Sequence, residues 1–188
     1  KLGSKLDISM LDCQVAILEN AVSRFSIEKK NPTPLGTDHP SIAPFGSFNT
    51  LDGSIVIAAG NEKIFSRFCK VIDDKEMSTN PLFINNECRN KNLTKLRRRV
   101  ESKLRTKSSS YWQKEMSKNK IPCSLVNNIE DVINHPQVLE RNMILNYNHR
   151  SVKNLKISGN PIKFNFHKYT NKAKKSPKLD ENKKEILK

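Results

Sequence analysis

The sequence predicts an α+β fold with a small hairpin-and-helix domain in the middle of the chain. A turn signal, Asp52-Gly53, separates residues 45–50 from an apolar, β-branched run at residues 54–59, a pattern typical of a β-hairpin. Segments with apolar residues at helical spacing follow this hairpin, so we expect helices to pack on its strands. With 188 residues, the chain is long enough to bury a core of its own.

The segment before the hairpin is predicted to form an amphipathic helix followed by a loop. Apolar residues recur at three-to-four spacing from Leu11 to Phe25, and we expect this helix to end near Ser26. Residues 31–44 contain four prolines, which is too many for a helix or a central strand. We interpret this stretch as a linker or a wrapped loop.

Three helices are predicted after the hairpin, at residues 61–73, 90–106 and 110–118. Asn61 is placed to cap the first, and Ser110 has capping-box spacing at the start of the third. The side chains expected to face the core are Ile64, Phe65, Phe68 and Ile72, then Leu93, Leu96, Val100 and Leu104, then Trp112 and Met116.

The sequence of the last third of the chain predicts short strands and short helices. We expect strands near residues 121–126, 143–147 and 155–157, and a capped helical turn at residues 128–133. His135-Pro136 is typical of a helix start. The Lys-rich end carries one further helical signal, Glu185-Ile186-Leu187.

The net charge of +15 favours nucleic acid or another anionic partner when it is taken alone. The charge comes from 25 Lys and only 9 Arg, however, and aromatic residues are 6% of the chain. Nucleic-acid readers favour Arg for bidentate contacts and aromatic side chains for stacking. Nucleic-acid binding is therefore the weaker interpretation, and the basic run at residues 97–99 is interpreted as a solvated helix face.

Other classes of protein find little support in the sequence. The cysteines are scattered singly, so we expect reduced thiols and no metal site; they are Cys13, Cys69, Cys88 and Cys123. No apolar run is long enough to span a membrane and no apolar signal core is present, which predicts a cytoplasmic protein.

Candidate catalytic groups are few. No nucleophile-elbow, phosphate-loop or dinucleotide motif occurs in the sequence. Glu62 is the one carboxylate placed where side chains converge, just past a buried strand. Its position alone is explained more simply by favourable placement of a negative charge at a helix N-terminus than by catalysis.

Several motifs follow one another along the chain in an order that is more specific than any one of them. They are Asp7-Ile8-Ser9-Met10-Leu11-Asp12, Pro34-x-Gly36-Thr37-x-His39-Pro40-Ser41-Ile42-Ala43-Pro44-Phe45, Phe48-x-Thr50-x-Asp52-Gly53, Asn80-Pro81-x-Phe83-x-x-Asn86-x-x-Arg89, Ile121-Pro122-Cys123-x-x-Val126, His135-Pro136-Gln137-Val138 and Gly159-Asn160-Pro161-Ile162-Lys163-Phe164. In this order they resemble the class III CoA-transferases, or CaiB/BaiF family, which includes formyl-CoA transferase and α-methylacyl-CoA racemase.

The resemblance covers about residues 6–187 and corresponds to the C-terminal half of such an enzyme. It implies a final strand and helix of a large α/β domain at residues 1–30, a linker at 31–44, a small domain at 45–140, and a return segment with a basic tail at 141–188. The family's catalytic aspartate and most of its coenzyme A site lie upstream of the matched part. The resemblance therefore implies a segment that is inactive alone and that forms a homodimer once joined to the missing large domain.

The resemblance also implies roles for particular residues. Gly36, Thr37 and His39 match a loop that closes over the active site in formyl-CoA transferase-like members, so they are substrate-binding candidates. Glu62 matches a glutamate that lies near the catalytic histidine in racemase-like members. The main expectation is transfer of CoA between an acyl-CoA thioester and a carboxylic acid; a racemase-like fragment, a basic nucleic-acid-binding protein and a remnant without biochemical role are the alternatives.

Overall fold

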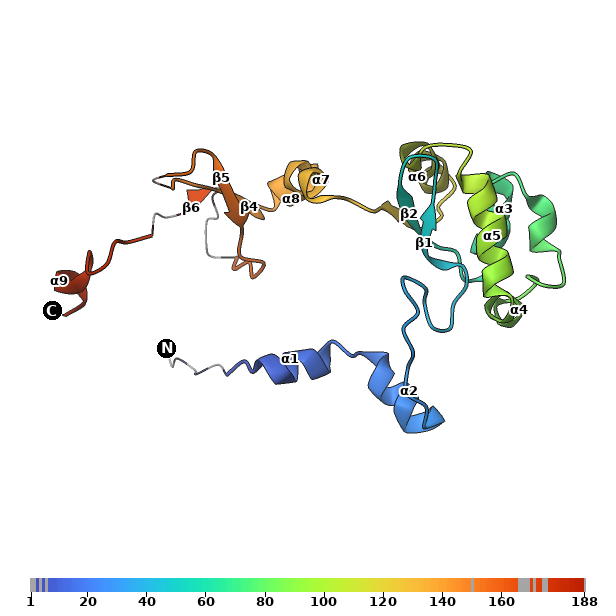
Figure 1. Ribbon diagram of the computed structural model, residues 1–188, viewed down its shortest axis with the longest axis horizontal. Helices are drawn as coiled ribbons and strands as arrows, with labels where there is room; N and C mark the ends of the chain where they lie inside the picture. Colours follow the sequence, from blue (N-terminus) through green and yellow to red (C-terminus); the bar gives the residue numbers. More distant parts are fainter. Residues whose placement is uncertain are drawn as a thin grey trace. The chain divides into compact units, whose positions relative to one another are not determined.

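The computed structural model describes residues 3, 5, 7–149, 151–165, 170, 172–173 and 176–187. The chain divides into two compact units, the first reaching Leu125 and the second beginning at Val126. Each unit contains one three-stranded sheet, and Figure 1 shows the elements coloured along the sequence. The α+β class is confirmed, whereas the domain bounds expected from the resemblance stay a prediction.

The sheet of the first unit is antiparallel with strand order β1-β2-β3, where β1 is Phe45–Asn49, β2 is Ser54–Ala58 and β3 is Cys123–Leu125. The predicted hairpin is present, with Asn49 opposite Ser54 across a four-residue loop. An Asp-Gly turn favours a positive φ at its glycine, but Gly53 does not adopt one, because a loop of this length does not need the tight two-residue turn. Asp52 instead accepts hydrogen bonds from the backbone and hydroxyl of Ser109, which fasten the loop to the following helices.

Helices follow the hairpin: α3 Glu62–Val71, the 3-10 turn η1 Lys75–Ser78, α4 Asn86–Lys91, α5 Leu93–Leu104 and α6 Ser109–Lys118. Asn61 caps α3 as predicted, with its side chain accepting from the backbone of Ile64 at 2.8 Å. The helix expected at residues 90–106 is instead the end of α4 and the whole of α5, which meet at Asn92. The start of α6 was misplaced by two residues, since Ser108 rather than Ser110 is its cap.

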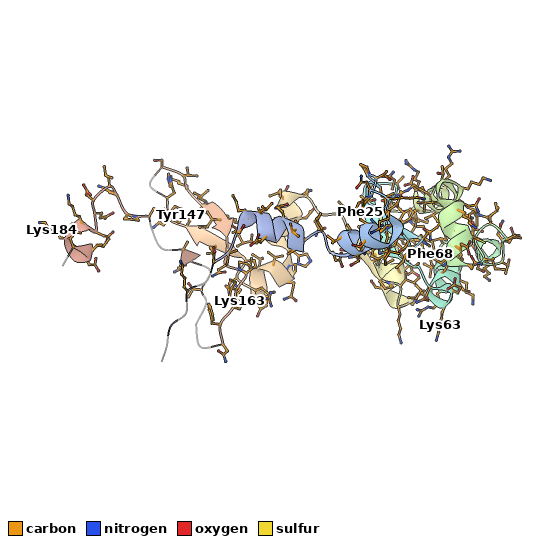
Figure 2. All side chains as sticks on the ribbon, turned by 90° about the horizontal axis from the view of Figure 1, so that it is seen from below. Phe25, Lys63, Phe68, Tyr147, Lys163 and Lys184 are labelled. Atoms are coloured by element: carbon orange, nitrogen blue, oxygen red, sulfur yellow. The ribbon has the colours of Figure 1, made fainter. Side chains whose placement is uncertain are left out.

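The core lies between the sheet and these helices, and it uses the predicted apolar faces. Figure 2 shows Phe68 among densely packed side chains, whereas Lys63 on the same helix points outward. Trp112 is buried and donates from its indole nitrogen to the Leu104 carbonyl at 2.7 Å. The predicted core residues that are buried are Phe65, Phe68, Ile72, Leu96, Val100, Leu104, Trp112 and Met116, while Ile64 and Leu93 pack at its margin.

The outer edge of β1 is occupied by the linker and by α5. Four backbone groups of the strand make hydrogen bonds there. The pairs are Phe45 O with His39 N (2.8 Å), Ser47 N with Thr37 Oγ1 (3.0 Å), Ser47 O with Arg97 Nη1 (2.7 Å) and Asn49 N with Glu101 Oε1 (3.2 Å). The linker is thus a wrapped loop that lies along the sheet.

The segment before the linker forms two short helices, α1 Met10–Ala16 and α2 Asn20–Glu28, rather than the single helix predicted to end at Ser26. The positive φ of Glu19 interrupts the helical path between them. Neither helix buries a residue. Their apolar side chains therefore remain on the surface of this chain.

The second unit begins with α7 Ile129–Asn134 and α8 Pro136–Glu140, which start at the predicted positions with Asn128 and His135 as caps. Its sheet has the order β5-β4-β6, in which β4 is Ile144–Tyr147, β5 is Leu155–Ser158 and β6 is Lys172–Ala173. A last short helix, α9, spans Lys183–Ile186. Within the described ranges, none of the helices has the length and apolar character needed to cross a bilayer.

Candidate functional site

The predicted lid-like loop is held against the edge of β1. Gly36 has a φ of 64°, the left-handed region that favours glycine, in a turn closed by Asp38 N and Leu35 O. His39 stacks on Phe45 with ring centroids 5.1 Å apart. Together with the edge hydrogen bonds of Thr37 and His39, these contacts fix all three candidate lid residues in place; their substrate-binding role stays a prediction.

Asp38, inside this loop, was not singled out from the sequence. Its carboxylate accepts from Arg97 of α5 at 2.7 Å, an ion pair in which both side chains are largely shielded from solvent. The loop approaches the strand so closely that a Cβ atom at Gly46 would lie 2.5 Å from Asp38 Oδ1. Glycine is therefore required at this position for the loop to reach the sheet.

Glu62 lies at the first turn of α3, directly after β2. Its Oε1 atom accepts two hydrogen bonds from α4: one from the backbone N–H of Asn86 at 3.1 Å and one from Nη2 of Arg89 at 3.3 Å. No described residue donates to Oε2, and the side chain is 59% exposed. The carboxylate is thus held by one oxygen and presents the other to solvent.

Arg89 is the residue that sequence analysis missed at this site. Its side chain is completely buried, and the guanidinium lies 4.4 Å from the ring centroid of Phe65. It donates to three backbone carbonyls, those of Ala43 (2.6 Å), Phe83 (3.2 Å) and Gly60 (2.7 Å). Burial lowers the pKa of Arg89 from its usual range, and the neighbouring Glu62 carboxylate opposes this effect.

Asn86 completes the connection between the linker and Glu62. Its side chain accepts from Ala43 N at 3.0 Å and donates to Ser41 O at 2.7 Å, while Asn90 donates to the same carbonyl at 2.9 Å. The i, i+3 spacing of Asn86 and Arg89 in one of the resemblance motifs was the signal that could have identified this cluster. We call Glu62, Asn86 and Arg89 the Glu62 cluster.

A pocket of about 440 Å³ opens beside the Glu62 cluster. Its wall is largely apolar, and polar side chains come from Asn61, Glu62 and Asn86. The apolar lining is formed by Ile42, Phe45, Ala58 and Ile64. Gly60 is needed here, because a Cβ atom at this position would overlap the side chain of Ile42.

The structure brings only part of the predicted site together. Gly36, Thr37 and His39 do not line the pocket. His39 is connected to it only through its stacking on Phe45, which is one of the lining residues. Among described residues no group of three metal-ligating side chains gathers. Burial raises the pKa of the Cys69 thiol to about 12, so this cysteine is not a nucleophile at neutral pH.

The basic run on α5 is not simply a solvated face. Arg97 pairs with Asp38, and also with Glu101 at 3.0 Å. Arg99 makes a bidentate pair with Asp74 at 2.6 and 2.7 Å, which holds the pKa of that carboxyl below its usual range. Because two of the three consecutive arginines are neutralised by carboxylates of the chain itself, this run gives little support to nucleic-acid binding.

The sequence model described as CoA-transferase family III matches residues 2–183. The chain is 31% identical over 179 residues to the acetyl-CoA:oxalate CoA-transferase of Acetobacter aceti, a match that covers 95% of this chain and 45% of that protein. It is 29% identical over 186 residues to the succinyl-CoA:glutarate CoA-transferase of Homo sapiens, covering 99% of this chain and 42% of that protein.

The fold is similar to that of a CAIB/BAIF family protein from Brucella suis, with a TM-score of 0.78 and 25% sequence identity. That match covers 97% of this chain and 47% of the solved chain. The chain thus spans less than half the length of these relatives. Since the family match extends over almost every residue, the chain belongs to CoA-transferase family III.

Proposed function

We propose that this chain is the C-terminal part of an enzyme that moves CoA between an acyl-CoA thioester and a carboxylic acid, and that it is inactive alone. The observation that carries the proposal is the family match over residues 2–183, combined with relatives that bear the names of CoA-transferases. The order of the sequence motifs supports assignment to the C-terminal rather than the N-terminal part.

The chemistry of the reaction explains why a further segment is needed. A carboxylate nucleophile attacks the acyl-CoA carbonyl, the C–S bond breaks, and CoA leaves as a thiolate that later forms the new thioester. In the resemblance this nucleophile is an aspartate upstream of residues 6–12. In the resemblance Asp7 and Asp12 belong to the strand-helix junction that follows this aspartate. The Glu62 carboxylate is engaged by Arg89, so none of the three is proposed as the nucleophile.

The surface of α1 and α2 supports the presence of a missing partner. Leu11, Val22 and Phe25 are 72%, 50% and 44% exposed, although their spacing is that of a buried helix face. We infer that the large domain covers this face, and that two complete copies then form the dimer expected for the family. The coenzyme A site lies mainly on that large domain.

Reconstitution tests the proposal. The chain would be expressed with the polypeptide encoded directly upstream of Lys1, and acyl-CoA products would be measured for each piece and for the two together. We expect co-purification and CoA transfer only from the pair. As a matched control, Val22→Asp on the α2 face should reduce co-purification, whereas Val152→Asp in the second unit should not. Two pieces that never associate, or a chain active alone, would contradict the proposal.

A racemase-like reaction is the second candidate, and the geometry of Glu62 is what favours it. A carboxylate that lines a pocket and is held through only one of its oxygens can orient or relay a proton. The reconstituted pair would therefore also be incubated with an α-methylacyl-CoA in D₂O. Exchange of the α-hydrogen without any transfer of CoA would favour the racemase.

A further inference from the structure

A second pocket, of about 260 Å³, lies where the end of α2 meets the start of the linker. Its polar lining comes from Arg24, Glu28, Lys30, Asn31 and Thr33. Lys29 ends α2 with a φ of 55°, so the chain turns there and residues 30–33 line the same pocket as the last turn of the helix. The volume is just below the range of about 300–1,000 Å³ that is usual for drug-sized ligands, so it suits a smaller molecule.

Arg24 is a cation whose hydrogen-bonding capacity is unused. Its Nε atom is shielded from solvent yet has no hydrogen-bond partner, and no ion pair of the guanidinium is found within the described residues. A shielded donor without an acceptor is costly, which points to an acceptor that this chain does not supply. Arg24 follows Val22 by two residues, so it leaves the helix on the opposite side from that apolar side chain.

Glu28 carries the opposite charge in the same pocket, and Arg24 does not use it. The two side chains are four residues apart on α2, a spacing at which an arginine and a glutamate commonly pair. In the part of the chain that the structure describes, however, no ion pair joins them, and none joins Lys30 to Glu28. Two cations and one anion therefore line a common space without a charged partner of their own.

The charges of this pocket narrow the class of ligand. A simple anion would pair with Arg24 and Lys30 but would also meet the Glu28 carboxylate, and a simple cation would be repelled by the two basic side chains. A molecule that carries a carboxylate and an ammonium group on one carbon atom gives each of these charges a partner. The apolar part of the lining, two proline rings and Leu35, offers surface for a short aliphatic side chain.

We propose that this pocket binds a free α-amino acid with a small aliphatic side chain. The Arg24 guanidinium donates to the ligand carboxylate, for which its planar fork is well suited, and Lys30 adds a second cation. The ligand ammonium group donates to Glu28. Because the ligand then contacts α2 and the residues that follow it, it holds the last turn of α2 against the start of the linker. The proposal concerns residues 24–40 and is independent of CoA transfer.

Three probes with the same carbon skeleton test the proposal: L-valine, isovalerate, which lacks the ammonium group, and L-valinamide, which lacks the carboxylate. Backbone amide chemical shifts of the full chain would be followed by NMR as each probe is added. We expect L-valine to shift resonances of residues 24–40, and each analogue to bind about tenfold more weakly because it lacks one charge-assisted pair. Equal binding of the three probes, or shifts confined to other parts of the chain, would overturn the proposal.

Two variants separate the two charged contacts. In Arg24→Gln, L-valine should lose most of its advantage over L-valinamide, and in Glu28→Gln most of its advantage over isovalerate. Both positions lie on a helix that buries no residue, so neither change disturbs the core. Arg98→Gln on α5 and Glu140→Gln on α8 make the same changes of charge at exposed positions and should bind L-valine like the parent chain. Parent-like binding in Arg24→Gln, or weaker binding in the two controls, would overturn the proposal.

Hydrogen exchange gives a second readout, which a loosely attracted ligand would not change. Since α2 buries no residue, its amides should exchange quickly in the free chain. Saturating L-valine should slow exchange in the last turn of α2 in the parent chain but not in Arg24→Gln. Exchange that L-valine leaves unchanged in the parent chain would show that no ligand bridges α2 and the linker, and would overturn the proposal.

Discussion

Arg89 is a buried cation on which the geometry of the candidate site depends. It contacts the linker through Ala43, the end of β2 through Gly60 and the segment before α4 through Phe83. A buried charge is costly unless its hydrogen-bonding capacity is used, and here three carbonyls and a carboxylate use it. The side chain therefore holds three separate segments in one arrangement.

Replacing the Arg89 side chain tests whether it holds these three segments together. Arg89→Met should lower the free energy of unfolding by about 3–5 kcal/mol, because three buried carbonyls and Glu62 lose their donor. Arg98→Met, on the exposed side of α5, is the matched control and should change it by less than about 0.5 kcal/mol. Urea unfolding followed by tryptophan fluorescence of Trp112 measures both. Similar values for the two variants would mean that Arg89 is not structurally important.

The Arg99–Asp74 pair predicts a pH dependence. The pKa of Asp74 is lower in the folded chain than its ordinary value of 3.8, chiefly through hydrogen bonds from Arg99. Its contribution to stability is therefore complete above that ordinary value and is lost as pH falls through the folded pKa. Since Arg99 is a third exposed, we expect a contribution of about 1 kcal/mol.

Asp74→Asn should thus reduce stability at neutral pH and flatten its decline below about pH 4. Asp73→Asn is the neighbouring control, because Asp73 is exposed and asparagine tolerates its positive φ of 54°. Unfolding curves recorded from neutral pH to below about pH 4 would measure how the stability of each variant depends on pH. A slope in Asp74→Asn that equals that of the parent chain would exclude a role for the pair.

At the scale of elements, α1 and α2 differ from the helices of the core. They contain 7 and 9 residues and bury none, whereas α5 contains 12 residues and buries Leu96, Val100 and Leu104. Short helices without packed side chains are only marginally stable in water. We expect backbone amides of α1 and α2 to exchange with solvent much faster than those of α5.

Hydrogen exchange measured by mass spectrometry tests this difference. The chain should be diluted until it is monomeric, so that self-association cannot protect the helices. Protection of α1 equal to that of α5 under these conditions would show that the chain buries this face by itself. Slower exchange of α2 on addition of the large domain would locate the missing partner.

The elements were largely predictable from the sequence, and the exceptions have physical causes. Local signals identified the hairpin, the cap at Asn61 and the apolar face of α5, because a cap or an amphipathic face depends on residues that are close together in the sequence. The break at Glu19 was missed because no glycine or proline lies near it in the sequence, although Glu19 adopts a positive φ. The split between α4 and α5 at Asn92 was also missed, because no glycine or proline lies near that position in the sequence.

The site was less predictable than the fold, because its key contacts join residues far apart in the chain. Glu62 was identified by its place after a strand, but its partner Arg89 lies 27 residues away. Arg97 was interpreted as solvated, although its partner Asp38 lies 59 residues away. Helix periodicity describes one face of one element and contains no information about such partners.

At the scale of the whole molecule, charge and apolar surface act in opposition. The net charge of +15 keeps copies apart at low ionic strength, while the faces of α1 and α2 favour association. We expect self-association of the isolated chain to increase when salt screens the charge. Sedimentation velocity at low and high salt measures this directly.

Val22→Lys combined with Phe25→Lys should suppress the association, because it places charge on the exposed apolar face of α2. Ile129→Lys adds charge at a 78% exposed position of the second unit and should have little effect. A parent chain that stays monomeric at every salt concentration would contradict the expectation. Association that persists in the double variant would place the contact elsewhere.

The covered edge of β1 has a consequence for how copies of this chain can meet. Exposed strand edges are where proteins add foreign strands and begin to form fibrils. At Phe45, Ser47 and Asn49 the outward-facing groups already bond to the linker and to α5. An incoming strand would find those donors and acceptors taken, so misassembly by sheet growth is blocked on this side even when the helices are left without their partner.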